Sequence, residues 1–383
     1  MKTVFILGAG FSIPCGAPPQ SKIIESILAL QKDKSIGVSQ KKLIDDYISK
    51  FKEFIDQNLF VSEDGLFKTA LEDIFTPLDR CIIEDISFRD IDPKSLIGIR
   101  DILYALIAAA ISKSICKTEE NYIEKFVNYL ITQTQVRKIN PNEDNVAVIS
   151  TNWDIILDNA IQKALKKMRL KDEDFAGVVD YCCYMSSLKD DKSIKPGLYA
   201  LGKGKFNIKL LKLHGSMNWL ICPRCQRLYV NFYKDFQGIY LIKKHYCKHC
   251  QENFGNKKHN SILLRTNLIM PTFLKSLNNF QIKLVWQNAG IELSEADKIV
   301  FIGYSLPQAD FELRQLLSRM LKKNVDVRVV LTEYDKPING LEIYSAGFRY
   351  KTFFGNNNIN ITYNGVEDYI ENELTTIEFS HYN

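Results

Sequence analysis

The chain has 383 residues, of which 46% are hydrophobic and 25% are charged. These proportions are ordinary for a globular protein and exclude extended disorder. The length allows one or two domains with a large buried core. The formal net charge is +5, from 50 lysines and arginines against 45 acidic residues. This small excess is spread along the chain, so the charge alone does not predict binding to nucleic acid.

No stretch of the sequence contains the roughly 18 to 20 uninterrupted apolar residues that a membrane-spanning helix needs. The longest apolar stretch, around 102–111, is flanked by charged residues and is typical of a buried helix. The apolar run at 4–7 is too short for a signal peptide and leads directly into glycines. We therefore expect a cytoplasmic protein with no membrane partner.

The run 4–7 predicts a first strand, which ends in the turn Gly8-Ala9-Gly10-Phe11-Ser12. Apolar residues then recur at three- and four-residue spacing, with interruptions, from about 21 to 135, which predicts helices. From 146 onward, strands and helices alternate. We expect strands at 146–149, 209–213, 298–302 and 326–331, and helices at 155–168, 284–294 and 311–321.

Alternating strand–turn–helix units predict an α/β protein with a Rossmann-like, doubly wound parallel sheet, which binds its ligand beyond the carboxyl ends of the strands. We assign 1–20 and 140–375 to the sheet domain, 21–139 to a helical insertion and 219–258 to a small zinc-ribbon insertion. Four of the expected strands end in glycine, asparagine, aspartate, histidine or serine. Because such strand ends meet at one edge of a sheet, this coincidence is the main functional signal.

The first of these strand ends is the glycine turn at Gly8 and Gly10. Glycines after a strand let the backbone approach a phosphate, and the N-terminus of a following helix favours its negative charge. A lone Gly-x-Gly is weak evidence, and a plain tight turn fits equally well. Pro14 interrupts the full dinucleotide fingerprint, which argues against an ordinary dehydrogenase.

The next strand ends lead into Asn152-Trp153-Asp154 and His214-Gly215. An amide and a carboxylate two residues apart can both reach a ligand, although either one also suits the N-cap of the following helix. A histidine at a strand end suits a general base. The alternative is a structural histidine that is hydrogen-bonded inside the protein.

The last strand end is Gly303-Tyr304-Ser305, followed five residues later by Asp310. Glycine and serine at this position suit a phosphate or a ribose. Asp310 either joins them or caps the helix that is expected to start at Phe311.

Four of the nine cysteines form two C-x-x-C pairs, Cys222 with Cys225 and Cys247 with Cys250. Each pair presents two thiolates from a knuckle turn, and four thiolates make a closed tetrahedral zinc site. A closed site leaves no position for a reactive water, so we expect structural Zn²⁺. Basic and aromatic residues between the pairs leave nucleic-acid binding as an open alternative.

Taken in this order, the motifs resemble those of the sirtuin superfamily. Gly8 to Ser12 is similar to its first glycine motif, and Asn152-x-Asp154 to the motif that contacts the nicotinamide ribose. His214-Gly215 is similar to its catalytic His-Gly, and Gly303-x-Ser305 to a later motif that contacts the cofactor. The cysteine pairs follow the histidine as the sirtuin zinc module does, whereas the helical stretch to about 135 has no sirtuin counterpart.

Two departures separate the chain from deacylating sirtuins. The segment 13–18 lacks the Pro-Asp-Phe-Arg run of those enzymes, and 303–310 differs from their peptide-docking strand. Thr151 to Asp154 and His214 to Trp219 instead resemble T-N-[YW]-D and H-G-S-x-N-W of bacterial antiphage proteins that hydrolyse NAD. That resemblance implies an oligomer that depletes NAD during abortive infection, and a hexameric translocase-type ATPase as a partner.

The resemblance also implies roles for the residues. The glycine turn, Thr151, Gly303, Ser305 and Asp310 would bind NAD. Asp154 would contact the carboxamide, Asn152 would position the ribose or the water, and His214 would act as the base. The alternatives are an NAD-dependent protein deacylase and a non-catalytic sensor of NAD or ADP-ribose.

Overall fold

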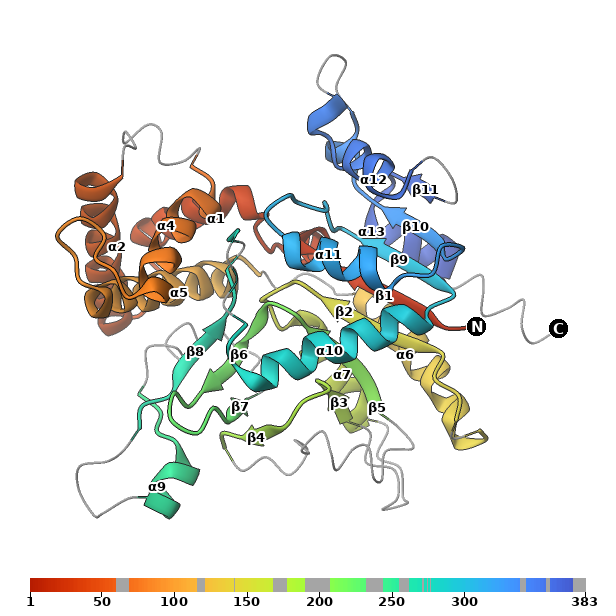
Figure 1. Cartoon of the computed structure of the whole chain (residues 1–383), viewed down its shortest axis with the longest axis horizontal. Coiled ribbons are helices and arrows are strands. Elements are labelled where there is room, and N and C mark those ends of the chain that lie inside the picture. The colour runs from red at the N-terminus through yellow and green to blue at the C-terminus, as the bar shows by residue number, and fades with distance from the viewer. Residues whose placement is uncertain are drawn as a thin grey trace.

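The computed structural model of the chain, drawn in Figure 1, describes residues 1–59, 69–115, 121–140, 142–167, 178–189, 207–231, 244–254, 262–270, 272–273, 275, 277–337, 342–355 and 359–374. Within these ranges the chain forms a large parallel sheet, a helical unit and a second, smaller sheet. Met168, the expected last residue of one helix, and parts of the expected zinc-ribbon segment lie outside them.

The large sheet has seven strands, and all of its neighbouring strands are parallel. Across the sheet the order is β11 (Ile359–Thr362), β10 (Asp326–Val330), β9 (Lys298–Ile302), β1 (Thr3–Leu7), β2 (Val146–Ser150), β5 (Asn207–Lys212) and β3 (Val178–Asp180). The chain goes from β1 to β2 on one side and later returns to β9 on the other side of β1. This is the strand order of doubly wound dinucleotide-binding folds, and it confirms the predicted α/β class.

The central strands are buried on both faces, which explains why their sequences are continuous apolar runs. All five residues of β1 and of β2 are buried. The expected strand 298–302 coincides with β9, and the other expected strands differ from the observed ones by one or two residues. The sequence did not predict β3, which has three residues, or β11, which is only partly buried.

Helices cover this sheet. They are α6 (Asn121–Gln135), α7 (Ile156–Lys167), α10 (Phe280–Glu295), α11 (Phe311–Met320), α12 (Ala346–Phe354) and α13 (Gly365–Asp368), which continues as a π-helical segment, Tyr369–Leu374. α10 and α11 pack against each other and lie in front of the sheet in Figure 1. α6 packs on β2 and β5, and also contacts α7 and the π-helical segment.

A separate helical unit follows the first strand and lies to one side of the sheet in Figure 1. It consists of α1 (Ile23–Ala29), α2 (Val38–Asn58), α4 (Leu71–Glu84) and α5 (Pro93–Ser114), which share their own apolar core. Asp92 caps α5 by accepting hydrogen bonds from the backbone N–H groups of Lys94 and Ser95, and Pro93 occupies the first helical position.

Helix α5 is long and apolar enough to cross a membrane if only length and composition are considered. Its apolar side chains, including Leu103, Leu106 and Ile107, are instead buried in the core of the helical unit, where α1, α2 and α4 pack against it. This is the buried helix that the sequence predicts around 102–111.

Helix α6 lies within the sequence range of the predicted insertion, 21–139, but its side chains belong to the core of the sheet. Tyr122, Ile123 and Phe126 are buried there, and the ring of Phe126 lies 5.1 Å from that of Phe5 on β1. The helical unit proper therefore ends with α5 among the described residues.

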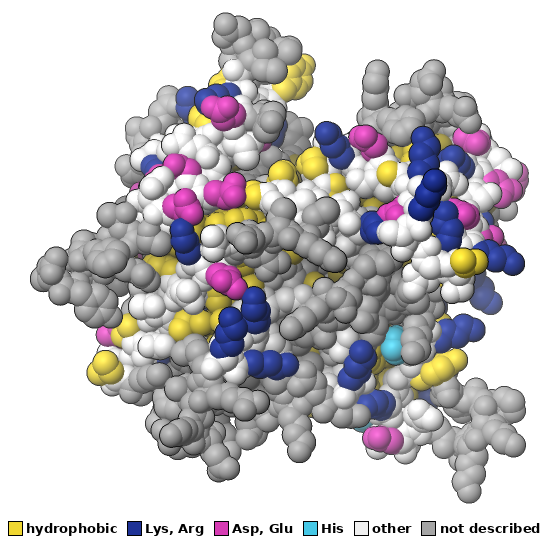
Figure 2. Space-filling view, turned by 180° about the vertical axis from the view of Figure 1, so that it is seen from behind, with side chains coloured by type: hydrophobic (Ala, Val, Ile, Leu, Met, Phe, Trp, Pro, Cys, Tyr) yellow, Lys and Arg dark blue, Asp and Glu magenta, His cyan; other side chains and the backbone are white. Residues whose placement is uncertain are grey.

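The smaller sheet has four strands in the order β4 (Met185–Ser187), β7 (Leu228–Val230), β6 (Gly215–Ile221) and β8 (Arg265–Leu268). Strand β6 begins directly after His214, and the cysteine pairs flank β7 in sequence. In the second pair, Cys247 directly precedes α9 (Lys248–Phe254) and Cys250 lies in it. Figure 2 shows the molecule from behind, where lysine and arginine side chains lie among acidic ones over much of the upper half.

A network of ion pairs ties the amino ends of the central strands together, at the edge opposite the strand-end glycines. Lys2 pairs with Asp144 at 2.8 Å and with Glu292 at 2.7 Å. Asp144 also pairs with Lys209 at 2.5 Å and with Arg137. Burial alone raises the pKa of Asp144, but the three cations, Lys209 foremost, lower it to about 2.

We predict that Asp144→Asn destabilises the fold by about 3 kcal/mol at pH 7, because it leaves buried cations without their shared partner. The folded-state pKa of Asp144 is depressed, so its contribution is full above about pH 4 and is lost as the pH falls toward 2. Denaturant unfolding of both proteins at several pH values measures this difference, which should shrink over that interval.

Asp326→Asn is the matched control at the same edge of the sheet. Asp326 lies 3.9 Å from Lys298 and its side chain is 64% exposed, so this change should cost less than about 1 kcal/mol. Equal losses in the two variants would contradict the assignment of the network.

Candidate active site

Four adjacent strands end at one edge of the large sheet, and each leads into a predicted site motif. In sheet order, His214 follows β5, Asn152 follows β2, Gly8 follows β1 and Gly303 follows β9. The chain reverses its direction across the sheet at β1, and ligands of such sheets bind beyond the carboxyl ends of the strands at this switch point. The fold thus brings the predicted residues to the position where this sheet type binds ligands.

The turns after β1 and β9 pack against each other through their glycines. The N–H of Gly10 donates to the carbonyl of Gly303 at 2.8 Å. A Cβ on Gly8 would lie 2.5 Å from Tyr304 Cα, and one on Gly10 would lie 2.6 Å from Gly303 Cα. Gly303 itself has φ +60°, which favours glycine. Close packing of two turns therefore requires all three glycines.

The helix behind the glycine turn begins close to the expected start at about 21. Three three-residue 3₁₀ turns, Ala9–Phe11, Ile13–Cys15 and Gln20–Lys22, come first, and α1 starts at Ile23. Pro14 lies in the second turn, where its fixed φ angle suits a tight turn better than a continuing loop. The dipole of a long helix is therefore not directed at this position.

Asn152 connects the ends of β1 and β2. Its side-chain Nδ2 donates to the carbonyl of Gly8 at 2.8 Å and to Ser12 Oγ at 3.3 Å. Within the described part of the chain, Oδ1 is left without a hydrogen-bond partner. Thr151 joins the same strands, because its hydroxyl donates to the carbonyl of Leu7 at 3.1 Å.

Asp154 is the N-cap that the sequence allowed, since its Oδ1 accepts the backbone N–H of Ile156 at 3.1 Å. Asn152 makes no such bond. Burial raises the pKa of Asp154 and outweighs the nearby charge of Lys212 and the hydrogen bond from Ser12. Burial is thus the dominant influence on the pKa of this carboxyl.

Lys212, the third residue before Gly215, is a buried lysine next to Asp154 that the sequence motifs did not indicate. Its side chain is 1% exposed, pairs with Asp158 at 3.1 Å and donates to the carbonyl of Asp154 at 2.5 Å. The available signal was a lysine in the apolar run before His214. A buried lysine of this kind fixes the backbone from which Asp154 projects.

His214 is held in place from two sides. The indole N–H of Trp286, on α10, donates to the carbonyl of Leu213 at 3.0 Å, and the rings of Trp286 and His214 lie 6.5 Å apart. On its other side, His214 Nε2 lies 3.2 Å from Oδ1 of Asp310. The imidazole is 6% exposed, so few orientations are open to it.

Asp310 precedes α11 but its side chain makes no capping bond, so the capping alternative is wrong for this residue. Its Oδ2 accepts the hydroxyl of Tyr304 at 2.6 Å, and Lys275 Nζ lies 3.1 Å from Oδ1. Burial alone raises the pKa of Asp310, but His214, Lys275 and Tyr304 together hold it well below its usual value. Sequence analysis missed Lys275 and Tyr304 as partners.

Ser305 and its neighbours are fixed by α12. Arg349 Nε donates to the carbonyl of Ser305 at 2.8 Å, and the hydroxyl of Tyr350 donates to the carbonyl of Tyr304 at 2.7 Å. Ser305 itself is only partly buried. The residue is therefore partly accessible, while its backbone is anchored by α12.

A polar cavity of about 190 Å³ lies between the helical unit and β8. Its walls include Arg100 and Asp101 on α5 and Arg265 on β8. Lys275 lines this cavity and also pairs with Asp310, so the cavity borders the site through that residue.

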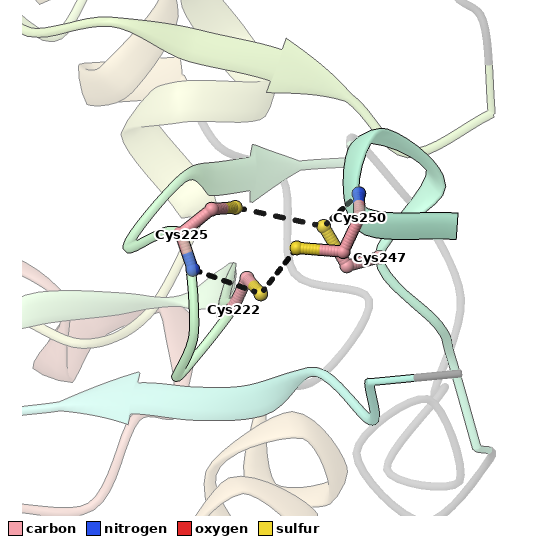
Figure 3. A group of neighbouring side chains, drawn as sticks. All are labelled: Cys222, Cys225, Cys247 and Cys250. Atoms are coloured by element: carbon pink, nitrogen blue, oxygen red, sulfur yellow. Dashed lines mark hydrogen bonds between the residues drawn. The ribbon is translucent and has the colours of Figure 1, made fainter. Parts of the chain in front are cut away.

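The four predicted zinc ligands come together at one end of the small sheet, as Figure 3 shows. The Sγ atoms of Cys222 and Cys250 lie 3.7 Å apart, as do those of Cys225 and Cys247. A tetrahedron with zinc–sulfur bonds of about 2.3 Å has edges of roughly 3.8 Å. Backbone N–H groups of Cys225 and Cys250 point at the first sulfur of each pair, as in a knuckle. The cluster fits a structural Zn²⁺.

No protein-family model matches the chain, and no curated protein matches it. Among solved structures, it is similar to two mutants of a Sir2 homologue in complex with ADP-ribose. Their TM-scores are 0.45 and 0.43 at 10% and 11% identity, and each match covers 100% of this chain and 93% of that one. A Sir2 complex with an inhibitor, 2′-O-acetyl-ADP-ribose and a deacetylated p53 peptide has a TM-score of 0.36 at 13% identity, covering 100% and 95%. These identities and TM-scores indicate only a similar path of the backbone.

We predict that the purified protein holds about one zinc ion per chain and that Cys250→Ser lowers this content to near zero. The expected melting temperature also falls, because the small sheet loses the ion that joins its two knuckles. Cys81→Ser is the control, since Cys81 is a buried thiol in α4, outside the cluster. Elemental analysis and thermal unfolding measure both effects, and full zinc content in Cys250→Ser would refute the ligand set.

Proposed function

We propose that the chain hydrolyses the bond between nicotinamide and ribose in NAD, releasing nicotinamide and ADP-ribose. The observation that carries this proposal is the meeting of Asn152, Ser12 and His214 at the switch point of a dinucleotide-type sheet. The order of these motifs along the chain, which resembles that of the sirtuins, supports NAD as the dinucleotide.

The proposed reaction needs two actions at the ribose, positioning and proton removal, and this site has a group for each. As the C1′–nitrogen bond breaks, its electron pair leaves with nicotinamide and the ribose gains oxocarbenium character. The free Oδ1 of Asn152 suits the ribose or the attacking water. His214 accepts the proton that the water loses when its oxygen bonds to C1′.

Asp154 and the turns have supporting roles in the proposed reaction. The carboxylate of Asp154 accepts a hydrogen bond from the NH₂ group of the nicotinamide carboxamide. The diphosphate is placed along the exposed side of Ala9 and Gly10 and the open face of Ser305.

Hydrolysis is favoured over protein deacylation by the segment after β9. A peptide substrate adds as an extended strand to an exposed edge. Here residues 303–310 form a turn in which Leu306 is fully buried with φ +51° and Asp310 points inward. This segment holds His214, so it offers no extended edge to an acyl-lysine peptide.

We also propose a setting for this activity. The resemblance of Thr151 to Asp154 and of His214 to Trp219 to antiphage NAD hydrolases supports NAD depletion in the cytoplasm of an infected cell. It equally supports a homo-oligomer and a hexameric translocase-type ATPase partner. The helical unit, absent from sirtuins, is our candidate for the surface that these partners use.

The test is product analysis by chromatography after incubation with NAD and no peptide. We expect nicotinamide and ADP-ribose in equal amounts from the wild type. His214→Ala should lower turnover by about 10² to 10⁴, the range for loss of a general base. Asn152→Ala should lower it similarly, because the ribose or the water loses its position.

His249→Ala is the control, since His249 lies on α9 near the cysteine cluster and bonds to Asn253. It should keep full activity. If the wild type is inert alone, the assay is repeated with acyl-peptide and with ADP-ribose binding by calorimetry. Turnover that requires the peptide would establish a deacylase, and tight binding without turnover would establish a sensor.

A further inference from the structure

We propose that Asp310 is a positioning residue that holds His214 in one tautomer, with Tyr304 and Lys275 fixing its carboxylate. This inference rests on the proposed function, in which His214 is the base. It replaces the expectation that Asp310 contacts NAD. The chemistry is that of a histidine–carboxylate pair, built from the ends of two strands on either side of the switch point.

Both oxygens of the Asp310 carboxylate already have partners within the protein. Oδ1 faces His214 Nε2 at 3.2 Å and Lys275 Nζ at 3.1 Å, and Oδ2 accepts the Tyr304 hydroxyl at 2.6 Å. The side chain is 2% exposed. All three neighbours are donors, so both oxygens have partners inside the protein.

Lys275 and Tyr304 are themselves fixed. The side chain of Lys275 is completely buried, and its Nζ also contacts the carbonyl of Ala309 at 2.9 Å and Glu312 Oε2 at 2.9 Å. The backbone of Tyr304 lies against Gly8, where a Cβ would come within 2.5 Å. The carboxylate is therefore anchored to the same packed turns that carry the glycine motif.

The tautomer of His214 follows from these contacts. An ionised carboxylate only accepts hydrogen bonds, so Nε2 carries a hydrogen and donates it to Asp310. In the neutral imidazole, Nδ1 then holds the lone pair. Within the described part of the chain Nδ1 has no hydrogen-bond partner, which leaves it as the basic nitrogen for the substrate. The carboxylate also stabilises the imidazolium that forms when Nδ1 takes a proton.

The first experiment separates positioning from binding by measuring kcat and KM for NAD in Asp310→Asn. We expect kcat to fall by roughly 10² to 10⁴ while KM stays within about threefold, because a wrongly held base slows chemistry without weakening binding. Tyr304→Phe removes one of the anchoring bonds and should cause a smaller fall in kcat. A raised KM with unchanged kcat would show a ligand-binding residue and overturn the proposal.

Glu312→Gln is the matched control. Glu312 lies on the same helix and pairs with the same lysine, but does not contact His214. Its kinetics should match the wild type, and its melting temperature shows the cost of weakening the contacts of Lys275. Equal losses of kcat in Glu312→Gln and Asp310→Asn would show that turnover does not depend specifically on the carboxylate that faces His214, and would overturn the proposal.

A second experiment does not depend on turnover, so it separates failure of this inference from failure of the proposed function. The ring nitrogens are observed by NMR in protein labelled with ¹⁵N-histidine, where the chain has only five histidines and His214→Ala identifies the signal. The wild type should show hydrogen on Nε2 alone, and Asp310→Asn should lose this single pattern. Hydrogen on Nδ1 in the wild type, or an unchanged pattern in the variant, would refute the positioning role of Asp310 even if the protein does not hydrolyse NAD.

Discussion

The site depends on the contact between two backbone turns, one after β1 and one after β9. Gly8, Gly10 and Gly303 let these turns approach until atoms of their main chains touch, and any side chain at these positions would overlap the other turn. Strands β1 and β9 are neighbours in the sheet, so the contact lies directly at the carboxyl ends of the two strands that meet at the switch point. The glycines thus serve first as packing residues, and only the outer side of the turns remains for a ligand.

The polar residues of the site are attached to this contact on both sides. Asn152 bonds to the carbonyl of Gly8, and Ser12 links it to Asp154. On the other side, Tyr304 lies against Gly8 and holds Asp310, which holds His214. A displacement of either turn would therefore move the proposed base, His214, and the amide proposed to contact the ribose, Asn152, relative to each other.

Much of this arrangement could be predicted from the sequence, because it follows from local patterns. Buried parallel strands are continuous apolar runs, and the residues that follow them meet at one edge, so β9 and the positions of Asn152 and His214 were foreseeable. The C-x-x-C spacing likewise predicted the cysteine cluster. These features depend on neighbours in the chain and on one rule of sheet geometry.

Other features depend on contacts between distant residues and left no local signal. Lys275 lies in an irregular segment 35 residues before Asp310, so nothing nearby indicated their ion pair. Asp310 stands at a helix N-terminus, where capping is the usual role, and only the tertiary contacts turn its side chain away. Helix α6 follows the helical unit in sequence, yet Phe126 packs on β1.

The central claim is that NAD lies across the packed turns with its ribose between Asn152 and His214. A crystal structure of the protein with ADP-ribose tests it most directly. We expect the diphosphate to lie along Ala9, Gly10 and Ser305. The ribose should contact Asn152 Oδ1 and face His214 Nδ1. ADP-ribose bound elsewhere, such as in the cavity beside Arg100 and Arg265, with the strand ends unchanged, would contradict it.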